Sequence, residues 1–193
     1  MAIGLTAGVP IRSGTAPAES TTAPTRVELN VPYISQRPYA DLCWAAVFAM
    51  LISRTGIATT MCQVASNVLS IRCCSATYVG ACDRGEDPRL PYQRNGSNID
   101  TYIGQYDPAH IIQEVGERGR PLQLFYDLGG GIGHTVLIVG YEEENGWLKI
   151  HDPWLGSGWW RYPVVQQACG LGGIWSHTFY NLGVPNGPNP SVA

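Results

Sequence analysis

The apolar pattern changes once along the chain, and this change limits the fold class most strongly. From Leu42 to Arg54 apolar residues recur without a breaker until Gly56, which predicts a largely buried helix. After Gly119 the pattern becomes that of short strands separated by glycine and Asn-Gly turns. These predicted strands are Leu122 to Tyr126, His134 to Tyr141, Trp147 to Asp152, Gly158 to Tyr162 and Gly173 to Tyr180. Helices followed by an antiparallel sheet indicate an α+β fold with a cleft between its two halves.

Three further segments carry local signals. Residues 27 to 34 alternate well enough for an edge strand, in which Pro32 limits the pairing. Thr60 with Gln63 has the form of a capping box for a second helix that ends near Leu69. Asp107 before Pro108 predicts the start of a helix that ends at Gly119.

The length of 193 residues suits one domain with its own core. Residues 1–26 lack aromatic residues and show no apolar period, and residues 183–193 are rich in proline, asparagine and glycine. We therefore predict a flexible leader at 1–26, one domain at 27–182 and a flexible tail at 183–193. The sequence does not say whether the leader is a propeptide.

The charge balance excludes some partners. Charged residues make up only 14% of the chain, the net charge is -3, and neither sign forms a run, so we predict no nucleic-acid partner. The apolar stretches are too short to span a membrane. The low charged share is typical of an extracellular protein, although residues 1–10 lack the basic start of an intact signal peptide. We expect a secreted monomer, exported with a leader since removed or by a leaderless route.

Four of the six cysteines crowd into a short segment, at Cys62, Cys73, Cys74 and Cys82. The segment has adjacent cysteines, no histidine and no C-x-x-C pair, so disulfides are favoured over a zinc site. Adjacent cysteines rarely bond to each other. Cys62 therefore pairs with one of them and Cys82 with the other, in an order that the sequence leaves open.

Two residues have the positions of a nucleophile and its base. Cys43 opens the first helix, where the free N–H groups and partial positive charge favour a thiolate. A buried core cysteine would fit the same pattern. His134 begins a strand after the flexible segment 129–133, a suitable place for a general base at the rim of a cleft. The alternative is a rim histidine with no task.

Two more residues complete the predicted site. Asp152 ends the strand after that of His134, and the hairpin through Asn145-Gly146 brings it beside the imidazole. It would accept a hydrogen bond from Nδ1–H and leave Nε2 facing the sulfur, although an Asp before Pro is otherwise a turn-former. Gln36 could direct its amide N–H into the cleft and form an oxyanion hole with the backbone N–H of Cys43. The alternative is that Gln36 is a solvated loop residue without a catalytic role.

These residues resemble a known family. Gln36 with Cys43-Trp44-Ala45-Ala46, the segment 133–141 (GHTVLIVGY) and Asp152-Pro153-Trp154 are similar to the bacterial papain-like cysteine peptidases, in the branch of avirulence proteases and bacteriocin-processing peptidases. The resemblance covers about residues 27–182. It implies a papain-like fold with Cys43 as nucleophile, His134 as base, Asp152 as orienting acid and Gln36 as oxyanion donor.

The predicted reaction is hydrolysis of a protein or peptide substrate through a Cys43 thioester, without cofactor or metal, by a secreted bacterial protease or effector. Two alternatives stay open: acyl transfer or deamidation at the same site, and a non-catalytic binding module.

The remaining histidines and the sixth cysteine are interpreted as residues without a catalytic role. His151 points away from Asp152 along its strand, His177 is a packed or hydrogen-bonded histidine, and His110 lies at the surface. Cys169 is left unpaired and buried.

Overall fold

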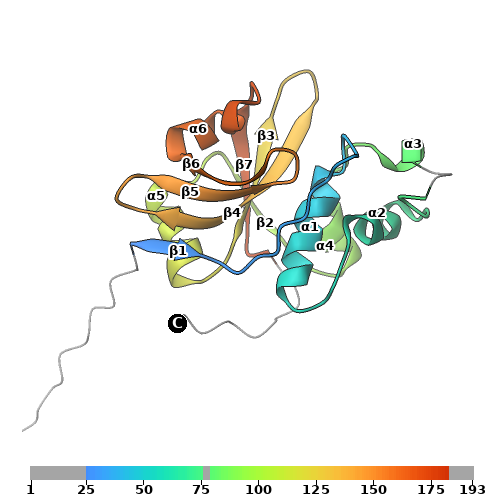
Figure 1. The fold of residues 1–193 in the computed structure, drawn as a ribbon, viewed down its shortest axis with the longest axis horizontal. Helices are drawn as coiled ribbons and strands as arrows, with labels where there is room; N and C mark the ends of the chain where they lie inside the picture. Colours follow the sequence, from blue (N-terminus) through green and yellow to red (C-terminus); the bar gives the residue numbers. More distant parts are fainter. Residues whose placement is uncertain (1–24, 76–78, 183–193) are drawn as a thin grey trace, which may run out of the picture.

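The computed structural model describes residues 25–75 and 79–182. Its strands form a seven-stranded antiparallel sheet in the order β2-β7-β3-β4-β5-β6, and β1 pairs with β4 (Figure 1). The strands are β1 Arg26–Glu28, β2 Asp100–Ile103, β3 Leu122–Asp127, β4 Gly133–Glu142, β5 Trp147–Asp152, β6 Gly156–Arg161 and β7 Ile174–Tyr180. The antiparallel sheet after a helical first half confirms the predicted α+β class.

Helices cover both faces of the sheet (Figure 1). The first half supplies α1 Cys43–Arg54, α2 Met61–Leu69, α3 Val79–Cys82 and α4 Leu90–Arg94. The second half supplies α5 Pro108–Ile111, which continues into the π-helix η1 Ile112–Glu117, then α6 Tyr162–Gln166 and the 3₁₀ turn η2 Ala168–Gly170. Every residue of α1 from Cys43 to Ile52 is buried, as the unbroken apolar pattern predicts.

Strand β4 lies between two hydrophobic cores. Leu137 and Val139 pack with α1 and α2, whereas Val136 and Ile138 pack with the helices on the opposite face. A strand that is covered on both faces reads as a continuous apolar run rather than an alternating one. Packing on both faces fixes the position of β4. It therefore also fixes the position of His134, which lies at the start of this strand.

Two local predictions at the ends of helices are confirmed. Thr60 and Gln63 form the reciprocal capping box at the start of α2. Asp107 accepts a hydrogen bond from the backbone N–H of His110 at the start of α5, with an N–O distance of 2.9 Å. The predicted helix does reach Glu117, but its second part is π-helical.

The structure corrects other boundaries. The edge strand predicted at 27–34 is limited to Arg26–Glu28, because the chain turns just after it: the backbone N–H of Val31 donates to the carbonyl oxygen of Leu29 and not to β4. The strand predicted to end at Tyr162 ends at Arg161, since Pro163 stands in the first turn of α6. The leader at 1–26 lies outside the described residues except for its last two positions, and the tail at 183–193 lies outside them entirely.

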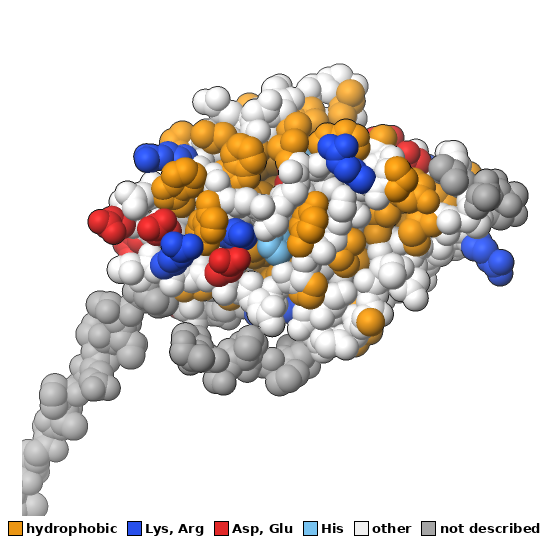
Figure 2. Space-filling view, in the orientation of Figure 1, with side chains coloured by type: hydrophobic (Ala, Val, Ile, Leu, Met, Phe, Trp, Pro, Cys, Tyr) orange, Lys and Arg blue, Asp and Glu red, His pale blue; other side chains and the backbone are white. Residues whose placement is uncertain are grey.

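The surface in Figure 2 shows apolar side chains with cationic and anionic groups scattered between them. Two exposed cations lie over tryptophan rings of the β5–β6 hairpin: the guanidinium of Arg26 lies 4.7 Å from the centre of the Trp159 ring, and that of Arg161 lies 5.2 Å from the centre of the Trp147 ring. Among the described residues no helix is long and apolar enough to cross a membrane.

Candidate active site

The two polar residues predicted on the sheet meet at one of its ends. His134 stands at the start of β4 and Asp152 at the end of β5, and these strands are antiparallel neighbours. The distance between His134 Nε2 and Asp152 Oδ1 is 2.8 Å, and both side chains are almost fully buried. The strand register therefore brings imidazole and carboxylate together.

Cys43 reaches the same imidazole from the helical half. It is the first residue of α1, it lines the same cleft as His134, and its thiol interacts electrostatically with that imidazole. Leu42 at the N-cap supplies no side-chain cap, so the first N–H groups of the helix are not used by a capping side chain. Thiol, imidazole and carboxylate thus form one chain of contacts across the two halves.

The ring nitrogens have the opposite assignment to the one predicted. Asp152 bonds to Nε2 of His134, which leaves Nδ1 as the nitrogen available to the sulfur. The prediction that Nδ1–H faces the carboxylate is wrong. The sequence places both residues at the same end of the sheet, but the choice of nitrogen depends on the side-chain rotamer, which no spacing reveals.

The hydrogen bonds of His134 favour its protonated form. Burial of the ring lowers the pKa of His134, but the hydrogen bond to Asp152 and the interaction with Cys43 outweigh this effect and raise the pKa to about 9. The imidazolium is therefore the form present at neutral pH. A cation next to a cysteine at a helix N-terminus is the environment that stabilises a thiolate.

Asp152 forms a turn and contacts His134 with the same oxygen. Its Oδ1 also accepts from the backbone N–H groups of Trp154 at 2.7 Å and Leu155 at 3.0 Å. Asp152 is therefore both a turn-former and the hydrogen-bond partner of the imidazole. The turn holds the carboxylate in place, and the hydrogen bond to this fixed carboxylate limits how the ring of His134 can rotate.

Gln36 lies in the wall of the cleft and is buried. Its Nε2 donates to the carbonyl oxygens of Tyr39 and Ala40, while its Oε1 has no hydrogen-bond partner. The amide N–H groups thus face the turn before Cys43 and not the open cleft that the sequence predicts. Its role as an oxyanion donor stays a prediction, since that role requires the amide to rotate.

The cleft between the two halves has a volume of about 710 Å³. Segment 85–89 forms the wall on the helical side, together with Asp41 and Trp44. Side chains of the sheet and of the β3–β4 loop form the opposite wall, and these residues include Phe125, Leu128, Ile132, His177 and Phe179. A cleft of this size, with apolar surface on one side and polar groups on the other, can hold several residues of an extended peptide.

Comparison with known proteins identifies the family. The model of the Peptidase C39-like family matches residues 28–178, which is most of the chain. The chain belongs to this family. No curated protein matches the sequence. The chain is thus a cysteine-type peptidase with a papain-like fold, as the sequence resemblance implies.

Solved structures share the fold of this C39-like peptidase at low sequence identity. A protein described as a C39-like peptidase from Bacillus anthracis is 16% identical with a TM-score of 0.51, covering 81% of this chain and 98% of its own. A double-glycine-motif protease from an AMS/PCAT transporter, solved with its leader peptide, is 16% identical with a TM-score of 0.51, covering 79% and 91%. Xylellain, a cysteine protease from Xylella fastidiosa, is 14% identical with a TM-score of 0.52, covering 85% and 89%.

The cysteine cluster of this C39-like peptidase forms two disulfides, Cys62–Cys74 and Cys73–Cys82. This pairing is one of the two orders that the sequence leaves open, and it removes these thiols as zinc ligands. Among residues 25–75 and 79–182 no group of three or more His, Cys, Asp or Glu is placed to hold a metal. Cys169 is free and buried, and this burial raises the pKa of its thiol to about 11.

The other histidines lie away from the three contacting residues. His151 points to the opposite face of β5 from Asp152, as predicted, and packs edge-on against Tyr33. His110 is exposed and pairs with Asp107. His177 is hydrogen-bonded to Ser176, as predicted, but it also lines the cleft.

Sequence reasoning missed the cleft walls. Phe125 and Phe179 fall in strands whose alternation is visible, yet nothing in the sequence tells which face of those strands meets the cleft. Asp83 accepts two backbone hydrogen bonds just ahead of Cys43, and a single acidic residue in a cysteine-rich loop gives no signal of that contact.

Proposed function

We propose that this C39-like chain hydrolyses peptide bonds with Cys43 as nucleophile, His134 as acid and base, and Asp152 as the group that orients His134. One observation carries the proposal: a single buried imidazole is hydrogen-bonded to a carboxylate and interacts electrostatically with the thiol of a cysteine at a helix N-terminus. Thiol, imidazole and oriented acceptor are the parts that nucleophilic cysteine catalysis requires.

The reaction proceeds in two stages. The Cys43 thiolate attacks the peptide carbonyl carbon, and the negative charge that forms on the oxygen is stabilised by the backbone N–H of Cys43. His134, protonated at neutral pH, then gives its proton to the leaving amine, and the carbon–nitrogen bond breaks to leave a thioester. In the second stage neutral His134 takes a proton from water, whose hydroxyl adds to the thioester carbon; the carbon–sulfur bond breaks, which releases the product acid and restores the Cys43 thiolate beside the His134 imidazolium.

Asp152 supports both stages without exchanging protons. Its charge stabilises the imidazolium, and its hydrogen bond to Nε2 keeps Nδ1 directed at the sulfur. Gln36 stands in the cleft wall as the predicted second oxyanion donor. Its participation would require the amide to turn from the carbonyls of Tyr39 and Ala40.

The substrate of the proposed reaction is a protein or peptide segment in extended form. The size of the cleft supports this, and one structural relative was solved with a leader peptide bound. We also propose that the protein is secreted by a bacterium as a protease or effector. The two disulfides support this location, because disulfides persist in oxidising compartments and are rare in the cytosol.

Incubation with a peptide library tests the activity, with products identified by mass spectrometry. The wild type should give pairs of fragments with a free carboxylate at the cut, and Cys43→Ala should give none. Products joined to an added amine, or a one-dalton gain at glutamine without cleavage, would replace hydrolysis by acyl transfer or deamidation. An unchanged library together with no labelling of Cys43 by a thiol-directed epoxide would contradict any catalytic function.

A further inference from the structure

The turn just ahead of Cys43 is stabilised by one carboxylate from a distant segment. Asp83 Oδ2 accepts from the backbone N–H of Ala40 at 3.0 Å, and Asp83 Oδ1 accepts from that of Asp41 at 2.8 Å. These are the residues three and two positions before Cys43. Because α1 has no capping side chain of its own, Asp83 supplies the nearest side-chain support to the start of the helix.

The same segment contacts the residue that follows Cys43. The indole Nε1–H of Trp44 donates to the carbonyl oxygen of Arg84 at 3.0 Å, and Trp44 is almost fully buried. Residues 83 and 84 therefore hold the chain on both sides of Cys43. A small displacement of this segment would move the thiol relative to His134, which is held by the sheet.

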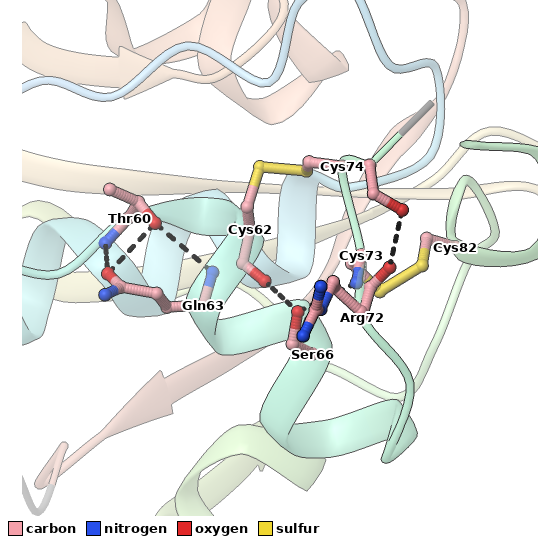
Figure 3. The surroundings of a disulfide bond; sticks show 9 residues. Thr60, Cys62, Gln63, Ser66, Arg72, Cys73, Cys74 and Cys82 are labelled. Atoms are coloured by element: carbon pink, nitrogen blue, oxygen red, sulfur yellow. Dashed lines mark hydrogen bonds between the residues drawn. A yellow bond between two sulfur atoms is a disulfide. The ribbon is translucent and has the colours of Figure 1, made fainter. Parts of the chain in front are cut away.

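A disulfide fixes the start of this segment. Cys82, directly before Asp83, is fully buried and bonded to Cys73. The backbone N–H of Cys73 in turn donates to Ser66 Oγ on α2 at 2.9 Å (Figure 3). The second disulfide joins Cys62 on α2 to Cys74, the residue after Cys73 (Figure 3). Neither of its cysteines is adjacent to Asp83 in the chain.

We propose that Asp83 is a positioning residue for Cys43 and that the Cys73–Cys82 disulfide holds Asp83 in place, so that the reactivity of the nucleophile depends on this bridge. The proposal rests on the proposed function, in which Cys43 is the nucleophile. It gives the disulfide a task beyond general stability, because the bridge is part of the contact chain that sets the thiol against His134.

Electrostatics and positioning make opposite predictions for Asp83. A carboxylate near Cys43 disfavours a second negative charge, so its removal by charge alone would promote the thiolate and speed its reactions. Loss of positioning would instead separate thiol and imidazolium and slow them. Asp83→Asn loses the charge but keeps one acceptor oxygen, whereas Asp83→Ala loses both acceptors. Positioning predicts wild type faster than Asn and Asn faster than Ala, while charge predicts both variants faster than wild type.

The rate of Cys43 alkylation by iodoacetamide measures this effect without a substrate. We expect about tenfold slower alkylation of Asp83→Ala, an intermediate rate for Asp83→Asn, and a kcat for peptide cleavage that falls more than KM rises. Asp107→Ala is the matched control, since it also removes a carboxylate that accepts a backbone N–H, but at α5. That control should alkylate within about twofold of wild type. Unchanged or faster alkylation of both Asp83 variants would overturn the proposal.

The disulfide is tested in the same assay. Cys73→Ser/Cys82→Ser should slow alkylation about as much as Asp83→Ala does, while Cys62→Ser/Cys74→Ser should slow it by less than about threefold. Adding Asp83→Ala to the first pair should have little further effect, because coupled contacts are not additive. Equal loss in the two disulfide variants, or full additivity with Asp83→Ala, would contradict the role of the bridge. Circular dichroism melting confirms that each variant is folded at the assay temperature.

The two proposals fail in different ways. If Cys43 of the wild type reacts no faster than an ordinary exposed thiol, the proposed function fails. If Cys43 reacts rapidly and the Asp83 variants match the wild type, only the positioning proposal fails.

Discussion

The sheet half and the helical half of the molecule hold their site residues by different means. His134 and Asp152 stand on neighbouring strands, β4 and β5, whose backbone ladder sets their separation. Cys43 stands at the start of α1, and the elements around it are short, with α3 only 4 residues long and α4 only 5. Disulfides and bonds from side chains to backbone connect them. One wall of the site is therefore fixed by strand pairing and the other by individual links.

This difference predicts unequal consequences when the site is dismantled, and the largest effect is on activity. Cys43→Ala and His134→Ala should each lower kcat/KM by about 10³-fold or more, because the parts of such a unit do not work separately. Only His134→Ala should also be strongly destabilised, by roughly 3 kcal/mol, since it leaves the buried Asp152 carboxylate without its cationic partner. Peptide cleavage and urea unfolding measure the two effects.

Cys169→Ala is the control for this pair, because Cys169 lies outside the cleft lining and its thiol is kept protonated by burial. It should keep the activity of the wild type. If the Cys43 and His134 variants are equally stable, the His134–Asp152 pair contributes no more to the free energy of unfolding than the Cys43 thiol does.

Reduction of the disulfides should affect one half more than the other. Each bridge closes a short loop, of 12 and 9 residues by sequence separation, and bridges of this size contribute about 2–3 kcal/mol. After reduction, amide hydrogen exchange should quicken in α2 and around α4, while β3, β4 and β5 keep their protection. Uniform loss of protection over the whole domain would contradict the comparison.

The same contrast explains how far the fold follows from the sequence. Strands β3, β4, β5 and β7 are predicted within about two residues of their observed bounds, because apolar periodicity and Asn-Gly turns act locally. Strand β2 and helix α4 were not predicted. Segment 90–103 carries Pro91 and Gly96, and its elements exist through tertiary contacts: Tyr92, for example, is fully buried and donates to Gln123.

The candidate site was predictable where it depends on strand order and not where it depends on rotamers or distant links. The order of Cys43, His134 and Asp152 along the chain placed all three at one cleft. The ring nitrogen that faces Asp152 and the direction of the Gln36 amide depend on side-chain torsions, which spacing does not encode. The contact of Asp83 with Ala40 joins residues 43 positions apart, and no local sequence pattern predicts it.

Substitution at Asp152 should have a smaller effect that separates orientation from charge. Asp152→Asn can still accept from His134 Nε2 and from the backbone of Trp154 through a carbonyl oxygen, whereas Asp152→Ala can accept from neither. The exchange of a charge-assisted hydrogen bond for a neutral one separates Asn from wild type by on the order of 1 kcal/mol, and loss of the remaining neutral hydrogen bond separates Ala from Asn by about as much again, or several-fold in rate. Asn should therefore be several-fold more active than Ala in steady-state kinetics. Wild-type turnover by a folded Asp152→Ala would reduce Asp152 to a turn residue.

The smallest expected effect is a shift in pH dependence, and it should distinguish the acid of the sheet half from the acid of the helical half. The pKa of His134 is raised from its ordinary value to about 9, so the imidazolium contributes to stability fully below about pH 6.5 and this contribution is lost as the pH rises through 9. The kcat/KM profile should accordingly fall on its alkaline side near pH 9. Asp152→Asn removes the charge that favours the imidazolium, so this alkaline fall should move to lower pH. The deficit in kcat/KM relative to wild type should grow between pH 6 and pH 8.

Asp83 bonds to the turn before Cys43 and makes no hydrogen bond or ion pair with His134. Asp83→Asn should therefore lower the plateau of kcat/KM and leave the alkaline fall in place. If both substitutions move the alkaline fall equally, both acids set the pKa of His134. The proposed difference, in which Asp152 acts on His134 and Asp83 positions Cys43, would then be wrong.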